Sequence, residues 1–177
     1  MSGEQRGRVG RIFLVGMMGA GKTTVGKLLA QRLGMRFVDT DQEIQNRTGV
    51  NITTIFEIEG EAGFRRRESA ILQELCGREG LMVATGGGIV LAAENRDLLR
   101  NGGTVVYLRA SVDDLFGRTR RDRSRPLLQT EDPRAKLSEL LVVRDPLYRE
   151  VADIIMDTST QSVHALVRQL ERKLSSA

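Results

Sequence analysis

Short runs of apolar, often β-branched residues alternate along this chain with longer segments in which apolar residues recur every three or four positions. The short runs predict five strands, at residues 12–15, 36–39, 81–85, 104–108 and 154–157. The longer segments predict helices at residues 22–33, 60–76, 92–100, 112–119, 134–148 and 162–174. Such alternation indicates an α/β domain whose parallel sheet is covered by helices on both faces. In sheets of this kind ligands bind beyond the carboxyl ends of the strands, so we expect functional residues there.

Two stretches depart from the alternation. Residues 118–125 contain five arginines and precede Pro126, and a segment so charged cannot be buried. We therefore expect a mobile lid at about residues 118–132. The region after the second strand is long enough for extra helices, and we expect a substrate-binding insertion there, at about residues 41–68. The length of 177 residues otherwise suits a single domain, residues 1–177.

The sequence GMMGAGKT at residues 16–23 matches the pattern G-x-x-x-x-G-K-[ST]. It follows an apolar strand and opens a helix, which favours a phosphate-binding P-loop over a chance glycine-rich turn. In such a loop backbone N–H groups and the helix N-terminus bind phosphates. Lys22 should reach the β- and γ-phosphates, and Thr23 should offer its hydroxyl to Mg²⁺. The nucleotide-binding residues expected here are Gly19, Ala20, Gly21, Lys22, Thr23 and Thr24.

A carboxylate to support Mg²⁺ is expected at the end of a strand. The run at 81–85 ends in Thr85 and three glycines, whereas the run at 36–39 ends in Asp39, with Asp41 close behind. Asp39 is therefore the expected metal-side carboxylate, acting through water because Mg²⁺ keeps much of its hydration. If the chain stays extended, Asp41 points the same way. Two alternatives remain open, in which Asp41 caps the next helix or Asp39 is only a turn residue.

Composition narrows the possible partners. The chain has 27 Lys and Arg against 23 Asp and Glu, and Arg, which binds planar anions bidentately, outnumbers Lys. Aromatic residues make up only 4%, so the charge alone does not indicate nucleic acid. The single cysteine, Cys76, excludes an internal disulfide and a cysteine-based metal site. No signal-peptide pattern or membrane-length apolar run is evident. We expect a cytoplasmic monomer with no nucleic-acid or membrane partner.

Further motifs follow in order along the chain: GEAGFR at 60–65 with Glu68, GGG at 86–88, RPLL at 125–128 and RDPLY at 144–148. Together with the P-loop and the Asp-Thr-Asp segment at 39–41, this set resembles the shikimate kinase family from residue 12 onward. The resemblance implies a P-loop NTPase fold, with a five-stranded parallel sheet in the order 2-3-1-4-5. It implies transfer of the γ-phosphate of ATP to the 3-hydroxyl of shikimate, giving 3-phosphoshikimate and ADP, in chorismate and aromatic amino acid biosynthesis. Mg²⁺ is the implied cofactor.

The resemblance also implies roles on the substrate side. Asp41 is similar to the carboxylate that binds the substrate hydroxyls near the reacting one. Arg65 and Arg144 are similar to the clamp on the substrate carboxylate. Gly87, with Gly88 beside it, is similar to the backbone contact in a turn where a side chain would obstruct close approach.

On the nucleotide side, Arg125 resembles the lid arginine that closes over the phosphates, and Arg118 an adenine contact. Asp39 resembles the magnesium-side carboxylate. Lys22, Asp41 and Arg125 are thus the expected catalytic residues. The loop at 157–161 reads DTSTQ and lacks the Arg or the Asn-Pro that some members carry there, and Gln161 is the adenine contact expected within it.

The residues themselves agree with this reading. A small carboxylate with several hydroxyls needs Arg forks and a hydroxyl acceptor. Glu61 and Glu68 lie four residues before and three after Arg65, so on a helix both can contact it. The alternative for Arg65 is a solvated helix face, which is the preferred interpretation of Arg66 and Arg67.

The sequence disfavours two other functions. A related kinase such as a gluconate kinase is disfavoured by the Arg65 and Arg144 pair with Asp39 and Asp41. A nucleic-acid-associated P-loop protein is disfavoured because no guanine-reading N-K-x-D motif occurs.

Overall fold

The computed structural model describes residues 10–176 of the chain. One sheet of five parallel strands runs in the order β2-β3-β1-β4-β5, which confirms the order that the resemblance implies. The strands are β1 (Arg11–Val15), β2 (Arg36–Asp39), β3 (Leu81–Ala84), β4 (Thr104–Arg109) and β5 (Ile154–Asp157). Each strand end lies within one residue of its predicted position, because the buried apolar runs are short and sharply bounded.

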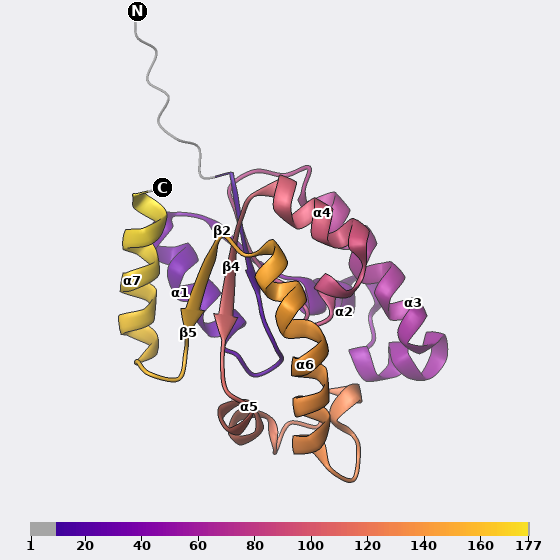
Figure 1. Cartoon of the computed structure of the whole chain (residues 1–177). Coiled ribbons are helices and arrows are strands. Elements are labelled where there is room, and N and C mark those ends of the chain that lie inside the picture. Colours follow the sequence, from indigo (N-terminus) through magenta and orange to yellow (C-terminus); the bar gives the residue numbers. More distant parts are fainter. Residues whose placement is uncertain (1–9, 177) are drawn as a thin grey trace, which may run out of the picture.

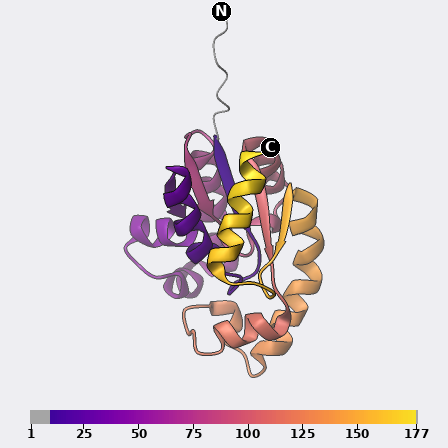
Figure 2. The same ribbon diagram turned by 90° about the vertical axis from the view of Figure 1, so that its left-hand side faces the viewer.

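Helices cover both faces of the sheet (Figure 1). They are α1 (Lys22–Leu33), α2 (Thr40–Thr48), α3 (Ile52–Leu75), α4 (Ala93–Gly102), α5 (Val112–Thr119), α6 (Pro133–Val151) and α7 (Val163–Ser175), with short turns η1 (Ile89–Leu91) and η2 (Pro126–Leu128). Helices α1 and α7 pack together on one face, and α3, α4 and α6 lie on the other. Figure 2, turned by 90°, shows α7 in front of the sheet. Within the described residues, no helix has the length and apolar character needed to cross a membrane.

The central strands are buried on both faces. All four residues of β3 are buried, and so are the residues of β1 after Arg11. This is the expected state of a parallel sheet between two helical layers. The carboxyl ends of the strands, at the lower end of Figure 1, carry the P-loop and lead into α5. The sheet therefore gathers the motifs at one edge.

The insertion after β2 differs from the prediction in one respect. The helix expected to begin at Gly60 begins at Ile52 instead, and Asn51 caps it by accepting a hydrogen bond from the Thr54 N–H at 2.8 Å. Gly60 lies inside α3 with φ 71° and ψ 178°, a conformation open essentially to glycine alone, so the helix is kinked there. The glycine marks a bend within the helix and not its start.

The lid segment is largely irregular. Arg118 lies in the last turn of α5, and between Arg120 and Asp132 the only regular structure is the η2 turn. A charged, proline-containing segment without a helix is what the sequence predicts here.

Candidate active site

The P-loop connects β1 to α1 and holds Lys22 at its centre. Gly21 caps α1 with φ 95°, a left-handed conformation that favours glycine. The Lys22 ammonium donates to the carbonyl oxygens of Gly16 at 2.6 Å and Met17 at 2.8 Å. The pKa of Lys22 is lowered to about 7, first by burial and then by the charge of Arg125. A phosphate group placed beside this ammonium would compensate for the lost hydration.

A hydroxyl and a carboxylate meet beside the P-loop. The Thr23 hydroxyl donates to Asp39 Oδ2 at 2.8 Å, and Asp39 Oδ1 accepts from the Gln42 N–H at 3.1 Å. The helix cap is therefore Asp39, and the alternative that made Asp41 the cap is wrong. Hard oxygen donors of this kind fit Mg²⁺. Residues 10–176 contain no cluster of three or more His, Cys, Asp or Glu suited to a metal, so phosphate oxygens and water would have to complete its shell.

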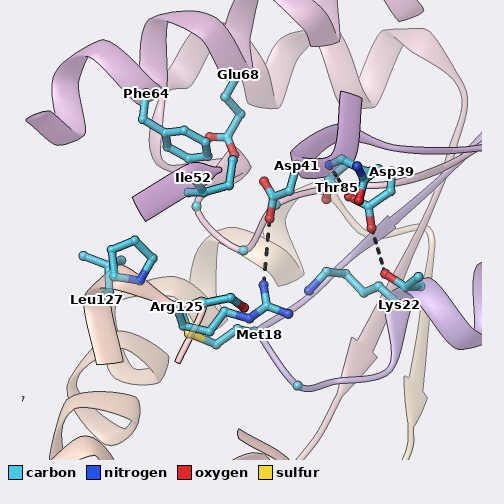
Figure 3. Close-up of a pocket in the computed structure, with 18 of the residues that line it drawn as sticks. Met18, Lys22, Asp39, Asp41, Ile52, Phe64, Glu68, Thr85, Arg125 and Leu127 are labelled. Carbon is cyan, nitrogen blue, oxygen red and sulfur yellow. Dashed lines mark hydrogen bonds and ion pairs between the residues drawn. The ribbon is translucent and has the colours of Figure 1, made fainter. Parts of the chain in front are cut away.

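Asp41 faces the same cavity as Asp39, although the reason given from the sequence is wrong. The chain is not extended across both residues, because α2 begins at Thr40. Asp41 Oδ1 is buried without a hydrogen-bond partner in the described structure, and its Oδ2 lies 3.9 Å from Arg125 NH1 (Figure 3). Burial raises the pKa of Asp41, and the neighbouring charge of Asp39 adds to this. The carboxylate is thus available to accept a hydrogen bond from a ligand.

Two arginines approach the cavity from α3 and α6. Arg65 NH1 donates to Glu68 Oε1 at 3.0 Å, and Arg65 NH2 to Glu61 Oε1 at 3.3 Å, so both predicted contacts are present. Arg144 is only 1% exposed, yet its Nε and NH1 have no partner within the described residues, and neither has Arg65 Nε. Buried polar groups are almost always hydrogen-bonded, so these donors fit an anionic ligand in the cavity. Arg66 and Arg67, by contrast, are exposed as expected.

The glycine loop after β3 comes close to both arginines. A Cβ atom on Gly88 would overlap the Arg65 guanidinium, and one on Gly87 would lie 3.2 Å from Arg144 NH1. The Gly86 N–H donates to the Thr40 hydroxyl at 2.9 Å, which ties the loop to the start of α2. A side chain at Gly87 or Gly88 would therefore displace the arginine that it meets.

These groups line one cavity of about 420 Å³. Most of the predicted site residues border it: Gly19, Gly21, Lys22, Thr23, Thr24, Asp39, Asp41, Arg65, Gly87, Gly88, Arg125 and Arg144. Its apolar wall includes Ile52, Phe64 and Leu127, with Met18 on the P-loop side (Figure 3). Phe64 is 4% exposed and so serves both core and cavity wall.

Sequence reasoning missed several lining residues. Gln42, Gln45 and Ile52 border the cavity without any prediction made for them. The spacing of Ile52 and Phe56, four residues apart, could have indicated a helix face that continues towards Phe64.

Three predicted nucleotide residues lie outside this cavity. Ala20 is buried in the P-loop. Arg118 NH1 donates to the Gly19 carbonyl at 3.0 Å and lies 3.4 Å from the Thr158 hydroxyl, so it links the P-loop to the loop after β5. Gln161 Nε2 lies in that same loop, 3.4 Å from the Asp157 carbonyl. Thr158, buried between them, was not predicted.

Comparison with known proteins is consistent with this geometry. A family model described as shikimate kinase matches residues 18–175. Shikimate kinase of Nitrosospira multiformis is 60% identical over 170 residues, covering 96% of this chain and 87% of that protein. Shikimate kinase of Bordetella pertussis is 61% identical over 163 residues, covering 92% of this chain and 77% of that protein. The solved structure of Acinetobacter baumannii shikimate kinase in complex with shikimate is 49% identical with a TM-score of 0.92, covering 95% of this chain and 94% of that one.

Proposed function

The chain belongs to the shikimate kinase family, which makes it an ATP-dependent small-molecule kinase, and we propose that it phosphorylates the 3-hydroxyl of shikimate, giving 3-phosphoshikimate and ADP. One observation carries this proposal. In the cavity beside the P-loop, buried guanidinium nitrogens of Arg65 and Arg144 and a buried oxygen of Asp41 all lack partners within the described residues. A small hydroxylated carboxylate satisfies both sets. Gluconate is also such a molecule, and the match to the shikimate kinase family favours shikimate over it.

We assign the substrate groups as follows. Arg65 and Arg144 bind the carboxylate, with Arg144 as the more buried of the two and Arg65 held by Glu61 and Glu68. Asp41 accepts a hydrogen bond from the hydroxyl that is phosphorylated. The backbone of Gly87 and Gly88 contacts the substrate at a point where a side chain would collide with the arginines.

The nucleotide lies along the P-loop, residues 19–24, in this proposal. Lys22 and Arg125 neutralise the transferred phosphate, and Arg118 and Gln161 are the candidate adenine contacts. Thr23 and Asp39 hold Mg²⁺, whose charge would offset that of the phosphates. The adjacency of the Thr23 hydroxyl and the Asp39 carboxylate, at 2.8 Å, supports this pairing.

The arrangement suits in-line transfer, which depends mainly on positioning and charge neutralisation. Arg125 reaches from the lid to within 3.9 Å of Asp41, so the lid arginine and the hydroxyl-binding carboxylate meet in one place. Asp41 orients the attacking hydroxyl and accepts its proton. Closure of the lid, at about residues 118–132, would exclude water and limit ATP hydrolysis.

Because the whole site is built from one chain, we propose a monomer, and size-exclusion chromatography with light scattering tests it. We further propose a single domain over residues 1–177 with the substrate insertion at about 41–68, a cytoplasmic location, and no nucleic-acid or membrane partner. Residues 1–9, where a signal peptide was not expected, lie outside the described part of the chain.

The deciding experiment is a coupled assay of ADP release with Mg-ATP and one candidate acceptor at a time. The acceptors are shikimate, quinate, gluconate and nucleoside monophosphates. We expect ADP release only when shikimate is the acceptor. NMR of the product should show a phosphate on the 3-hydroxyl. Folded protein that releases ADP with gluconate or a nucleotide, and not with shikimate, would contradict the proposal.

A further inference from the structure

Two tyrosines from different elements stack behind the cavity. Tyr107 lies on β4 and Tyr148 on α6, their ring centroids are 4.9 Å apart, and they are 1% and 0% exposed. Their hydroxyls donate to different partners. Tyr107 donates to Asp145 Oδ1 at 2.6 Å, and Tyr148 donates to the Gly87 carbonyl at 2.5 Å. Only Tyr148 therefore contacts the glycine loop of the site through its hydroxyl.

The backbone groups of residues 86–88 can be followed one by one. The Gly86 carbonyl accepts from the Ile89 N–H and the Gly88 carbonyl from the Leu91 N–H, both at 3.1 Å. The Gly86 N–H donates to the Thr40 hydroxyl. The remaining carbonyl, that of Gly87, is held by Tyr148. Among residues 10–176 no hydrogen bond uses the N–H groups of Gly87 and Gly88, which leaves them as donors for a ligand, and the bond from Tyr148 helps to set their direction.

The same side chain lies next to the buried arginine. Tyr148 follows Arg144 by four residues on α6, which places both on one helix face. The Arg144 guanidinium approaches Gly87 so closely that a Cβ there would lie 3.2 Å from NH1. Burial raises the pKa of Tyr148 well above its usual range, so its hydroxyl keeps its proton and remains a donor.

We propose that Tyr148 is a positioning residue of the substrate site, which holds the Gly87 carbonyl so that the Gly87 and Gly88 N–H groups and the Arg144 guanidinium face the bound carboxylate. The inference rests on the proposed function, because it concerns how shikimate is held. Tyr148 itself lies behind the loop, and its effect passes through Gly87 and Arg144. It should therefore alter shikimate binding and leave nucleotide binding alone.

The chain supplies a matched control for the test. Tyr148→Phe and Tyr107→Phe each remove one hydroxyl from a buried, hydrogen-bonded ring of the same pair. A purely structural role predicts similar behaviour of the two variants. A positioning role predicts that Tyr148→Phe raises the KM for shikimate about tenfold, the factor that corresponds to the loss of roughly one hydrogen bond between the misplaced donors and the carboxylate. Its KM for ATP should change less than about twofold, and Tyr107→Phe should leave both KM values within about twofold.

A rescue variant completes the experiment. Replacement of Tyr148 by p-aminophenylalanine keeps a donor at the same place and should return the KM for shikimate towards the wild-type value. If Tyr148→Phe does not fold, p-fluorophenylalanine at this position fills the space of the hydroxyl without donating and should raise the KM in its place.

Different results would overturn the proposed function and the role of Tyr148. Wild-type protein without shikimate-dependent ADP release would overturn the proposed function and the inference together. Active wild-type protein for which Tyr148→Phe and Tyr107→Phe have the same KM for shikimate would overturn the inference alone. A p-aminophenylalanine variant whose KM for shikimate is as high as that of Tyr148→Phe would also overturn the inference.

Discussion

Glu68 is the buried acid of the site, and it should make the stability of the protein depend on pH. Its side chain is 0% exposed, with one oxygen 3.0 Å from Arg65 NH1 and the other without a hydrogen-bond partner among residues 10–176. The pKa of Glu68 is raised from its ordinary 4.5 to about 7, mainly by burial, while the charge of Arg65 opposes the rise and that of Asp41 contributes to it. We predict that Glu68→Gln, which carries no ionisable proton, removes this pH dependence.

The sign follows from proton linkage. Between pH 4.5 and about 7 the folded state binds the Glu68 proton more tightly than the unfolded chain does. The free energy of unfolding therefore falls as pH rises through this window. The stability that the neutral acid provides is complete below pH 4.5 and lost above pH 7. At about 1.4 kcal/mol per pH unit, the loss is on the order of 3 kcal/mol.

The assay is urea unfolding of wild type and variants at several pH values from about 5 to about 8. The quantity of interest is the difference in unfolding free energy between wild type and Glu68→Gln, because other titrating groups largely cancel in it. This difference should shift by a few kcal/mol in favour of the variant as pH rises. Glu61→Gln is the control, since Glu61 also pairs with Arg65 but is 49% exposed, so this variant separates the loss of an ion pair to Arg65 from the loss of a buried acid. Parallel curves for wild type and Glu68→Gln would refute the reasoning.

Three further predictions concern the reaction. Lys22→Ala should lower kcat about 10²–10³-fold, the usual loss of one group that stabilises transition-state charge, while far-UV circular dichroism stays unchanged; near-normal turnover would show that this loop is not the phosphate site. Asp41→Asn should raise the KM for shikimate roughly 10- to 100-fold with little change for Mg-ATP, and Asp39→Asn should raise the Mg²⁺ requirement instead. Titration of each mutant with Mg-ATP and with shikimate tests this. If both mutants lose affinity for the same ligand to the same extent, the two acids act as one site. Arg144→Lys should raise the KM for shikimate at least about tenfold, because an ammonium cannot bind a carboxylate bidentately; an unchanged KM would remove Arg144 from the clamp.

Local signals in the sequence were enough for most of the elements. Helix α1 was placed correctly at both ends because Gly21 and Gly34 stand on either side of it in left-handed conformations. The start of α5 was also placed correctly, because Ser111 caps this helix. Such caps act over three or four residues, so they can be read without knowing the fold.

Where a local signal had two meanings, the prediction was wrong. Gly60 looked like the start of a helix and is a kink within α3. Asp41 looked like a possible cap of the next helix, whereas Asp39 accepts the capping hydrogen bond. In both cases the choice depends on how α2 and α3 pack, which neighbouring residues in the sequence do not report.

The sequence by itself determined the order of the motifs and the kind of chemistry, because a P-loop, arginine forks and a pair of carboxylates each have a recognisable local pattern. Tertiary structure decided which of these groups are buried and what they face. Tyr148 meets a carbonyl 61 residues away, and Arg118 meets one 99 residues away. Contacts of this kind exist only once the sheet has brought its strand ends together. For the same reason the raised pKa of Glu68 is a property of the fold, since burial between α3 and the glycine loop removes the water that would otherwise stabilise its charge.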